Sequence, residues 1–192
     1  MCIAIVTKPN KRLPDEWLAN SFNSNPDGGG IAYIQDGQVR IHKGLMEYDK
    51  FYEAYDAIQQ RAGHNHMLVH CRIATAGPVN QANCHPFRFK EGALIHNGHL
   101  WSPDNKEMSD TREFASIFYN ILDYDSLSRS IKEFDFADVI GNDKMAMLYD
   151  DGRVLRAGHW QEEDVGWFSN GGYKYGLTRW ENDAWDYNYC MM

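Results

Sequence analysis

A cysteine directly follows the initiator methionine and opens an apolar run, Met1-Cys2-Ile3-Ala4-Ile5-Val6, that is typical of a strand. If Met1 is removed, Cys2 carries a thiol and a free α-amino group on the same residue. The amine, with an ordinary pKa of about 7.7–8.0, can accept the thiol proton, so one residue supplies a nucleophile and its base. The small side chain of cysteine should permit removal of Met1. These six residues alone nevertheless favour a plain buried thiol at a strand start.

Four later residues could complete a site that hydrolyses a carboxamide through a thioester. That reaction needs donors for a developing oxyanion and charged groups that bind the substrate. Asn97-Gly98, after a predicted buried strand, offers a side-chain amide and a backbone N–H, although the pair also suits a tight turn. Arg72 at a strand end is either a bidentate carboxylate ligand or a surface arginine. Asp110 at a helix start can bind an ammonium group and can also cap the helix.

Length and composition indicate one ordinary globular domain. The chain has 192 residues, of which 43% are hydrophobic and 24% charged. Its net charge of −8 argues against a general nucleic-acid-binding surface. No apolar run approaches the ~18 residues of a membrane helix, and Lys8 to Arg12 interrupt any secretory signal. The four cysteines, at positions 2, 71, 84 and 190, lack paired spacing, which indicates reduced thiols in a cytoplasmic protein.

Residues with metal-ligating side chains occur in two adjacent pairs, His70-Cys71 and Cys84-His85. A zinc site could be assembled from these four residues, but no C-x-x-C spacing supports it. We therefore expect no metal ion and no cofactor.

The hydrophobic pattern predicts strands towards both ends of the chain and helices between them. Strands are expected at 3–6, 31–34, 39–41, 66–72, 93–96, 145–149, 153–157, 165–169 and 173–178, and helices from 14 and at 48–60, 109–122 and 126–134. Asp36-Gly37, Asp150-Asp151-Gly152 and Asn170-Gly171-Gly172 predict hairpin turns. This order favours two antiparallel sheets covered by helices, an α+β layered sandwich. Without an evident repeat or linker, residues 1–192 should form a single domain, with an acidic and aromatic tail at 180–192.

Short motifs along the chain occur in an order that resembles a known family. They are Met1-Cys2, Asp27-Gly28-Gly29-Gly30-Ile31-Ala32, His70-Cys71-Arg72-Ile73-Ala74-Thr75-Ala76-Gly77, Asn83-Cys84-His85-Pro86-Phe87, His96-Asn97-Gly98-His99-Leu100 and Ser109-Asp110-Thr111. Together they resemble the class II (N-terminal nucleophile) glutamine amidotransferases, in particular the glutaminase domain of amidophosphoribosyltransferase. Each motif is weak alone, and the combination is specific. The resemblance implies a four-layer αββα sandwich of the Ntn-hydrolase type.

The resemblance also implies a reaction and its catalytic groups. L-glutamine and water would give L-glutamate and ammonia through a γ-glutamyl thioester on Cys2. Cys2 would be the nucleophile and its own α-amine the general base. Asn97 and Gly98 would form the oxyanion hole.

The same resemblance implies how glutamine would be bound. Arg72 would bind the α-carboxylate of glutamine and Asp110 its α-ammonium group. Thr75 and Gly77 would line the pocket. These four assignments come from motif positions and are expectations for the structure.

Three functions remain open on the sequence. The first is a stand-alone glutaminase that feeds ammonia to a separate synthetase, because relatives fuse an ammonia-using domain for which 192 residues leave no room. The second is an Ntn acylase for another amide, which Arg72 with Asp110 disfavours because they suit an amino-acid head group. The third is a non-catalytic binding or regulatory module on the same scaffold. The tail at 180–192 would dock a partner or pack on its own domain.

Overall fold

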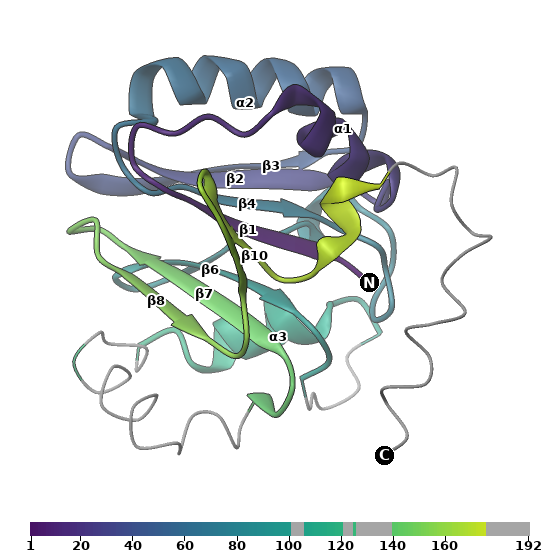
Figure 1. The fold of residues 1–192 in the computed structure, drawn as a ribbon. Coiled ribbons are helices and arrows are strands. Elements are labelled where there is room, and N and C mark those ends of the chain that lie inside the picture. The colour runs from purple at the N-terminus through teal and green to yellow at the C-terminus, as the bar shows by residue number, and fades with distance from the viewer. Residues whose placement is uncertain (101–105, 121–124, 126–139, 176–192) are drawn as a thin grey trace.

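The computed structural model describes residues 1–100, 106–120, 125 and 140–175, and shows two antiparallel sheets stacked face to face (Figure 1). The larger sheet has the strand order β3-β2-β4-β1-β10-β9 and the smaller the order β5-β6-β7-β8. The strands are β1 (Ile3–Thr7), β2 (Gly29–Gln35), β3 (Gln38–Leu45), β4 (Leu68–Cys71), β5 (Phe87–Phe89), β6 (Gly92–Asn97), β7 (Lys144–Tyr149), β8 (Val154–Ala157), β9 (Gln161–Glu163) and β10 (Gly166–Phe168). Helices α1 (Asp15–Asn23) and α2 (Tyr48–Ala62) cover the larger sheet, and α3 (Asp110–Ile117) covers the smaller. The expected α+β sandwich with αββα layers is confirmed.

Three sets of buried side chains join the four layers. Ile3 and Ile5 of β1 pack with Phe51 of α2 between the helices and the larger sheet. Ala4 and Val6 of the same strand belong to the cluster between the two sheets. A third cluster packs α3 against the smaller sheet. Successive residues of β1 therefore face two different apolar layers, which explains why this strand reads as an unbroken apolar run.

The hairpin predicted at Asp36-Gly37 is confirmed. β2 and β3 pair up to Gln35 and Gln38, which leaves a two-residue loop. Both loop residues have positive φ, 53° for Asp36 and 68° for Gly37. Positive φ at both positions is the geometry of a type I′ turn, which matches the right-handed twist of the strands.

The hairpin predicted at Asn170-Gly171-Gly172 is wrong. β10 pairs with β1 and β9, and a short 3₁₀ turn, η2 (Gly171–Lys174), occupies the start of the predicted strand 173–178. The side chain of Asn170 caps this turn by accepting a backbone hydrogen bond. The ring of Tyr173 is buried and stacks on Phe168 with 3.9 Å between ring centroids. The cap and the stacked ring fold the segment back over the sheet.

Two expected segments, the helix at 126–134 and the tail at 180–192, lie outside the described residues, as do 176–178 of the last predicted strand. The helix predicted from residue 109 corresponds to α3 and ends at Ile117. Within the described ranges, no helix combines the length and apolar character that crossing a membrane requires.

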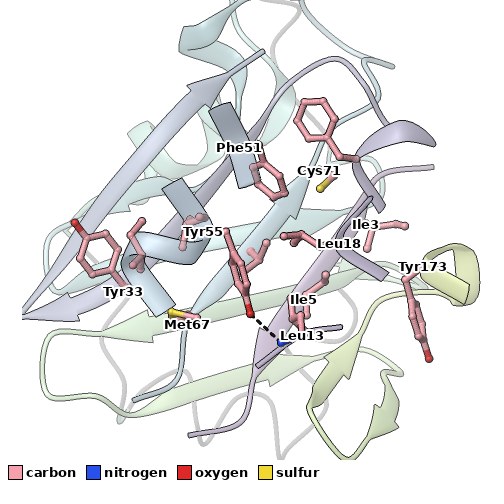
Figure 2. Close-up of a cluster of buried hydrophobic side chains, with 14 of the residues drawn as sticks. Ile3, Ile5, Leu13, Leu18, Tyr33, Phe51, Tyr55, Met67, Cys71 and Tyr173 are labelled. Atoms are coloured by element: carbon pink, nitrogen blue, oxygen red, sulfur yellow. Dashed lines mark hydrogen bonds between the residues drawn. The ribbon is translucent and has the colours of Figure 1, made fainter. Parts of the chain in front are cut away.

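We predict that Tyr55→Phe destabilises the fold by about 1–3 kcal/mol, because it leaves a buried donor without its acceptor. Tyr55 lies in the cluster between α2 and the larger sheet, where its hydroxyl oxygen accepts the Leu13 N–H at 2.9 Å (Figure 2). Urea denaturation measures the change. Tyr52→Phe is the matched control, because the Tyr52 hydroxyl bonds to Asp15 at an exposed position and should change stability by less than about 0.5 kcal/mol. Equal unfolding midpoints for the two variants would contradict the prediction.

Candidate active site

Cys2 lies at the head of β1, half-buried against the chain that leaves β4. Pairing of Ile3 with Cys71 brings it beside the residues after β4. Its Sγ donates to the Ile73 carbonyl oxygen at 3.2 Å and accepts from the Ile73 N–H at 3.3 Å. Burial raises the pKa of the Cys2 thiol, although the Ile73 hydrogen bond, the chain-terminal ammonium group and Arg72 act to lower it. The thiol is therefore protonated near neutral pH and needs a base to become a nucleophile.

Asn97 ends β6 in the smaller sheet and reaches across to β1. Its Nδ2 donates to Ser169 Oγ at 2.8 Å, and the same oxygen accepts the Ala4 N–H at 3.0 Å. Ala4 is two residues from Cys2. The Asn97 carboxamide therefore lies close to the head of β1, although Asn97 ends a strand of the smaller sheet and Cys2 precedes a strand of the larger one.

The main chain at Gly98 is held so closely that only glycine fits. Its φ of 151° disfavours other residues, and a Cβ at this position would collide with the Asp143 carboxylate. Asp143 Oδ2 accepts the His99 N–H at 2.7 Å and contacts His96 Nε2 at 3.2 Å. Asp143 thus holds the backbone N–H that follows Gly98 and the imidazole ring of His96.

Arg72 is buried directly after β4, with 2% of its surface exposed. Its guanidinium donates to the carbonyl oxygens of Ala76 at 2.8 Å, Pro78 at 3.1 Å and Gly77 at 3.4 Å. Among the described residues, no Asp or Glu lies within ion-pair distance of it. A buried guanidinium without a carboxylate partner is costly, and a bound carboxylate would offset that cost.

Asp110 is the first residue of α3, and Ser109 is the N-cap, accepting the Arg112 N–H at 3.3 Å. The Asp110 carboxylate accepts the Leu100 N–H at 2.8 Å through one oxygen and the Thr111 N–H at 2.6 Å through the other. No Lys or Arg of the described ranges forms an ion pair with it. Asp110 thus joins the segment after Gly98 to α3 and retains an unpaired negative charge.

Thr75 and Gly77 lie in the loop that leaves Arg72. Thr75 is exposed. Gly77 has a φ of 68° and packs against the Met108–Ser109 peptide, where a Cβ would approach to 2.7 Å. Gly77 therefore lets this loop lie directly against the start of α3.

These contacts close into a ring around the predicted site. From Cys2 the ring runs through Ile73 and the loop 73–78 to the start of α3. It continues through the Asp110 carboxylate to the segment that follows Asn97, and Ser169 joins Asn97 back to β1. Six of the seven predicted site residues lie on this ring, and the seventh, Arg72, donates hydrogen bonds to the carbonyl oxygens of its loop 73–78.

Four residues that hold the ring were not among the predicted site residues. Ser169 joins Asn97 to Ala4, and Asn170 Nδ2 donates to the Cys2 carbonyl oxygen at 2.9 Å. Asp27 accepts the Ala74 N–H at 2.7 Å, and the buried Asn83 amide donates to the Pro78 and Glu107 carbonyl oxygens. Asp27 and Asn83 stand in the motifs and could have been selected from them. Ser169 was expected only as the end of a strand and Asn170 only as part of a turn.

Three histidines are buried between the sheets beside the site. The rings of His70 and His85 stack with 4.0 Å between centroids, and His70 Nε2 contacts the His96 carbonyl oxygen at 3.1 Å. Burial lowers the pKa of His70 to about 3, that of His85 well below its usual range, and that of His96 as well. The histidines are therefore neutral. The described part of the chain contains no group of three or more His, Cys, Asp or Glu side chains placed to hold a metal ion.

The expected resemblance to class II glutamine amidotransferases is confirmed at the level of the fold. The glutamine phosphoribosylpyrophosphate amidotransferase of Bacillus subtilis, solved with ADP and GMP, matches 88% of this chain with a TM-score of 0.56 and 14% sequence identity. The match covers 42% of that enzyme's chain. This chain thus corresponds to less than half of the enzyme.

Two further proteins are similar to this chain. A glutamine aminotransferase class-II domain protein from Silicibacter pomeroyi matches 88% of this chain and 87% of its own, with a TM-score of 0.48 and 15% identity. An uncharacterized protein of Methanocaldococcus jannaschii is 32% identical over 116 residues, which is 56% of this chain and 33% of that protein. This chain thus matches about a third of that protein's length. No protein-family model matches the chain.

We predict that His85→Leu weakens the pH dependence of folding. The folded-state pKa of His85 lies below the unfolded value of about 6.5, so between these values the unfolded state binds one more proton and stability falls as the pH falls. Removing His85 should reduce the slope of the unfolding free energy against pH by about 1.4 kcal/mol per pH unit between pH 4.5 and 6. Urea denaturation across this range measures it. The exposed His64→Leu is the control, and a wild-type slope in His85→Leu would refute the prediction.

Proposed function

We propose that this chain is a class II glutaminase domain that hydrolyses L-glutamine to L-glutamate and ammonia through a thioester on Cys2. The observation that carries the proposal is the hydrogen-bonded link from β1 through Ser169 to Asn97, which sets a nucleophile candidate beside an oxyanion donor. The fold shared with the B. subtilis enzyme supports it. The ammonia is passed to a separate synthetase or released.

The first half of the reaction forms the thioester. After removal of Met1, the α-amine of Cys2 takes the thiol proton, and the thiolate attacks the amide carbon of glutamine. The side-chain N–H of Asn97 and the backbone N–H of Gly98 stabilise the negative oxygen of the tetrahedral intermediate. The carbon–nitrogen bond then breaks, and the α-ammonium group returns the proton to the departing ammonia.

The second half of the reaction hydrolyses the thioester. Water attacks the same carbonyl carbon, and the α-amine accepts its proton. The carbon–sulfur bond breaks, the thiol is regenerated and glutamate leaves. With Met1 in place, burial raises the pKa of the Cys2 thiol and keeps the sulfur protonated.

The charges on the ring provide the binding groups for the two ends of an amino acid. Arg72 is buried and has no carboxylate partner among the described residues, which suits the α-carboxylate of glutamine. Asp110, at the start of α3, forms no ion pair with a described Lys or Arg, which suits the α-ammonium group. An amide without this zwitterionic head group would leave both charges without partners.

We predict that protein without Met1 releases glutamate from L-glutamine and that Cys2→Ala does not, because the alanine variant lacks the nucleophile. Cys71→Ala should retain activity, because the Cys71 thiol is buried in the apolar cluster between the helices and the larger sheet. Intact mass measures Met1 removal, and mass spectrometry of the quenched reaction locates the γ-glutamyl adduct. Glutamate release by Cys2→Ala, or none from wild type lacking Met1, would refute the proposal.

Asp110→Asn should raise the KM for glutamine by about 10–100-fold with a smaller change in kcat, because it removes a charge-assisted hydrogen bond worth ~1.5–3 kcal/mol. Arg72→Ala should raise the KM at least as much. Glu113→Gln removes one negative charge from the same first turn of α3 and is the matched control. An unchanged KM in Asp110→Asn or Arg72→Ala removes that residue from glutamine binding.

A further inference from the structure

We propose that Ser169 and Asn170 are positioning residues that hold the nucleophile and the oxyanion donor in register, although neither touches the substrate. This inference rests on the proposed function. The two adjacent residues follow β10 and make four side-chain hydrogen bonds, three of which end on the strand of Cys2 or on Asn97.

Asn170 uses both ends of its carboxamide. Its Nδ2 donates to the Cys2 carbonyl oxygen at 2.9 Å, and its Oδ1 accepts the Gly172 N–H at 3.0 Å. An amide carries the donor and the acceptor that this bridge needs. Because the bond ends on the carbonyl of Cys2 itself, it restricts rotation of the residue that carries both the thiol and the prospective α-amine.

Ser169 acts on the other half of the site. Its Oγ accepts the Ala4 N–H at 3.0 Å and Asn97 Nδ2–H at 2.8 Å, and only 4% of the residue is exposed. The Asn97 amide carries two hydrogens, so one is held by Ser169 and the other remains for the substrate oxyanion. Ser169 also donates its backbone N–H to the Ala4 carbonyl oxygen at 2.9 Å.

The segment that carries these residues is itself anchored. β10 pairs with β1 up to Phe168, directly before Ser169. The buried ring of Tyr173 stacks on Phe168 and packs edge-on against Trp17 of α1, with 4.7 Å between the Trp17 and Tyr173 ring centroids. Ser169 and Asn170 are thus held between β1 and α1, so their side chains can fix other groups without moving themselves.

The two residues should have separable effects. Ser169→Ala should lower kcat for glutamine by about 10–100-fold with little change in KM, because Asn97 loses its orientation, whereas losing an oxyanion donor outright costs ~10²–10³-fold. In an Asn97→Ala background, Ser169→Ala should lower kcat no further, because its effect passes through Asn97. Asn170→Ala should lower kcat and also change the rate of Cys2 alkylation by iodoacetamide, which needs neither glutamine nor an oxyanion hole.

Asn20→Ala is the matched control. It also removes one carboxamide donor from a main-chain carbonyl of the same segment, at Tyr173, away from Cys2. It should leave kcat and the alkylation rate at the wild-type level. Thermal unfolding of each variant shows that it is folded, and Asn170→Asp, which keeps the acceptor for Gly172, replaces Asn170→Ala if the latter does not fold.

The outcomes separate this inference from the proposed function. Equal losses of kcat on adding Ser169→Ala to wild type and to Asn97→Ala overturn the role of Ser169. Equal effects of Asn20→Ala and Asn170→Ala on alkylation overturn the role of Asn170. Wild type that is alkylated at Cys2 but releases no glutamate overturns the proposed function, while the alkylation rates of the Asn170 variants still decide whether that residue positions the thiol.

Discussion

The pairing of β1 with β4 on one side and β10 on the other is the constraint on which the whole site depends. It sets Cys2 against the chain leaving β4 and against the residues following β10. Because β1 is also buried on both faces, the strand cannot slip by one residue without exchanging its two apolar sets, Ile3 and Ile5 for Ala4 and Val6. The register of one short strand therefore determines where the thiol lies.

The smaller sheet is joined to the site by polar contacts at the end of β6. The cluster between the sheets consists largely of small and aliphatic side chains, which brings the strands close together. At the site end, neutral histidines replace these aliphatic residues, and Asp143 and Ser169 join the segment around Asn97 to its surroundings. Hydrogen-bond donors at this end of a largely apolar interior are little screened by water, which strengthens their interactions.

Much of the fold could be predicted from sequence, since its signals are local. The apolar run of β1 and the Asp36-Gly37 turn report backbone preferences within a few residues. The motifs also selected Cys2, Asn97 and Asp110, which lie on one ring of contacts in the structure. The roles of Ser169 and Asn170 could not be predicted, because their partners Ala4 and Cys2 lie 165 and 168 positions away. An Asn-Gly pair has the same turn propensity whether its side chain faces water or a distant carbonyl.

The exposed first residue bears on how the proposed activation would follow folding. Met1 has 84% of its surface exposed, and none of the hydrogen bonds among the described residues involves it. Cys2, by contrast, is tied through both its sulfur and its carbonyl oxygen. An aminopeptidase can therefore reach the leading peptide bond on an already assembled scaffold, and cleavage leaves the strand register intact. Under the proposed function, this one cleavage would supply the base, as proteolysis activates a zymogen.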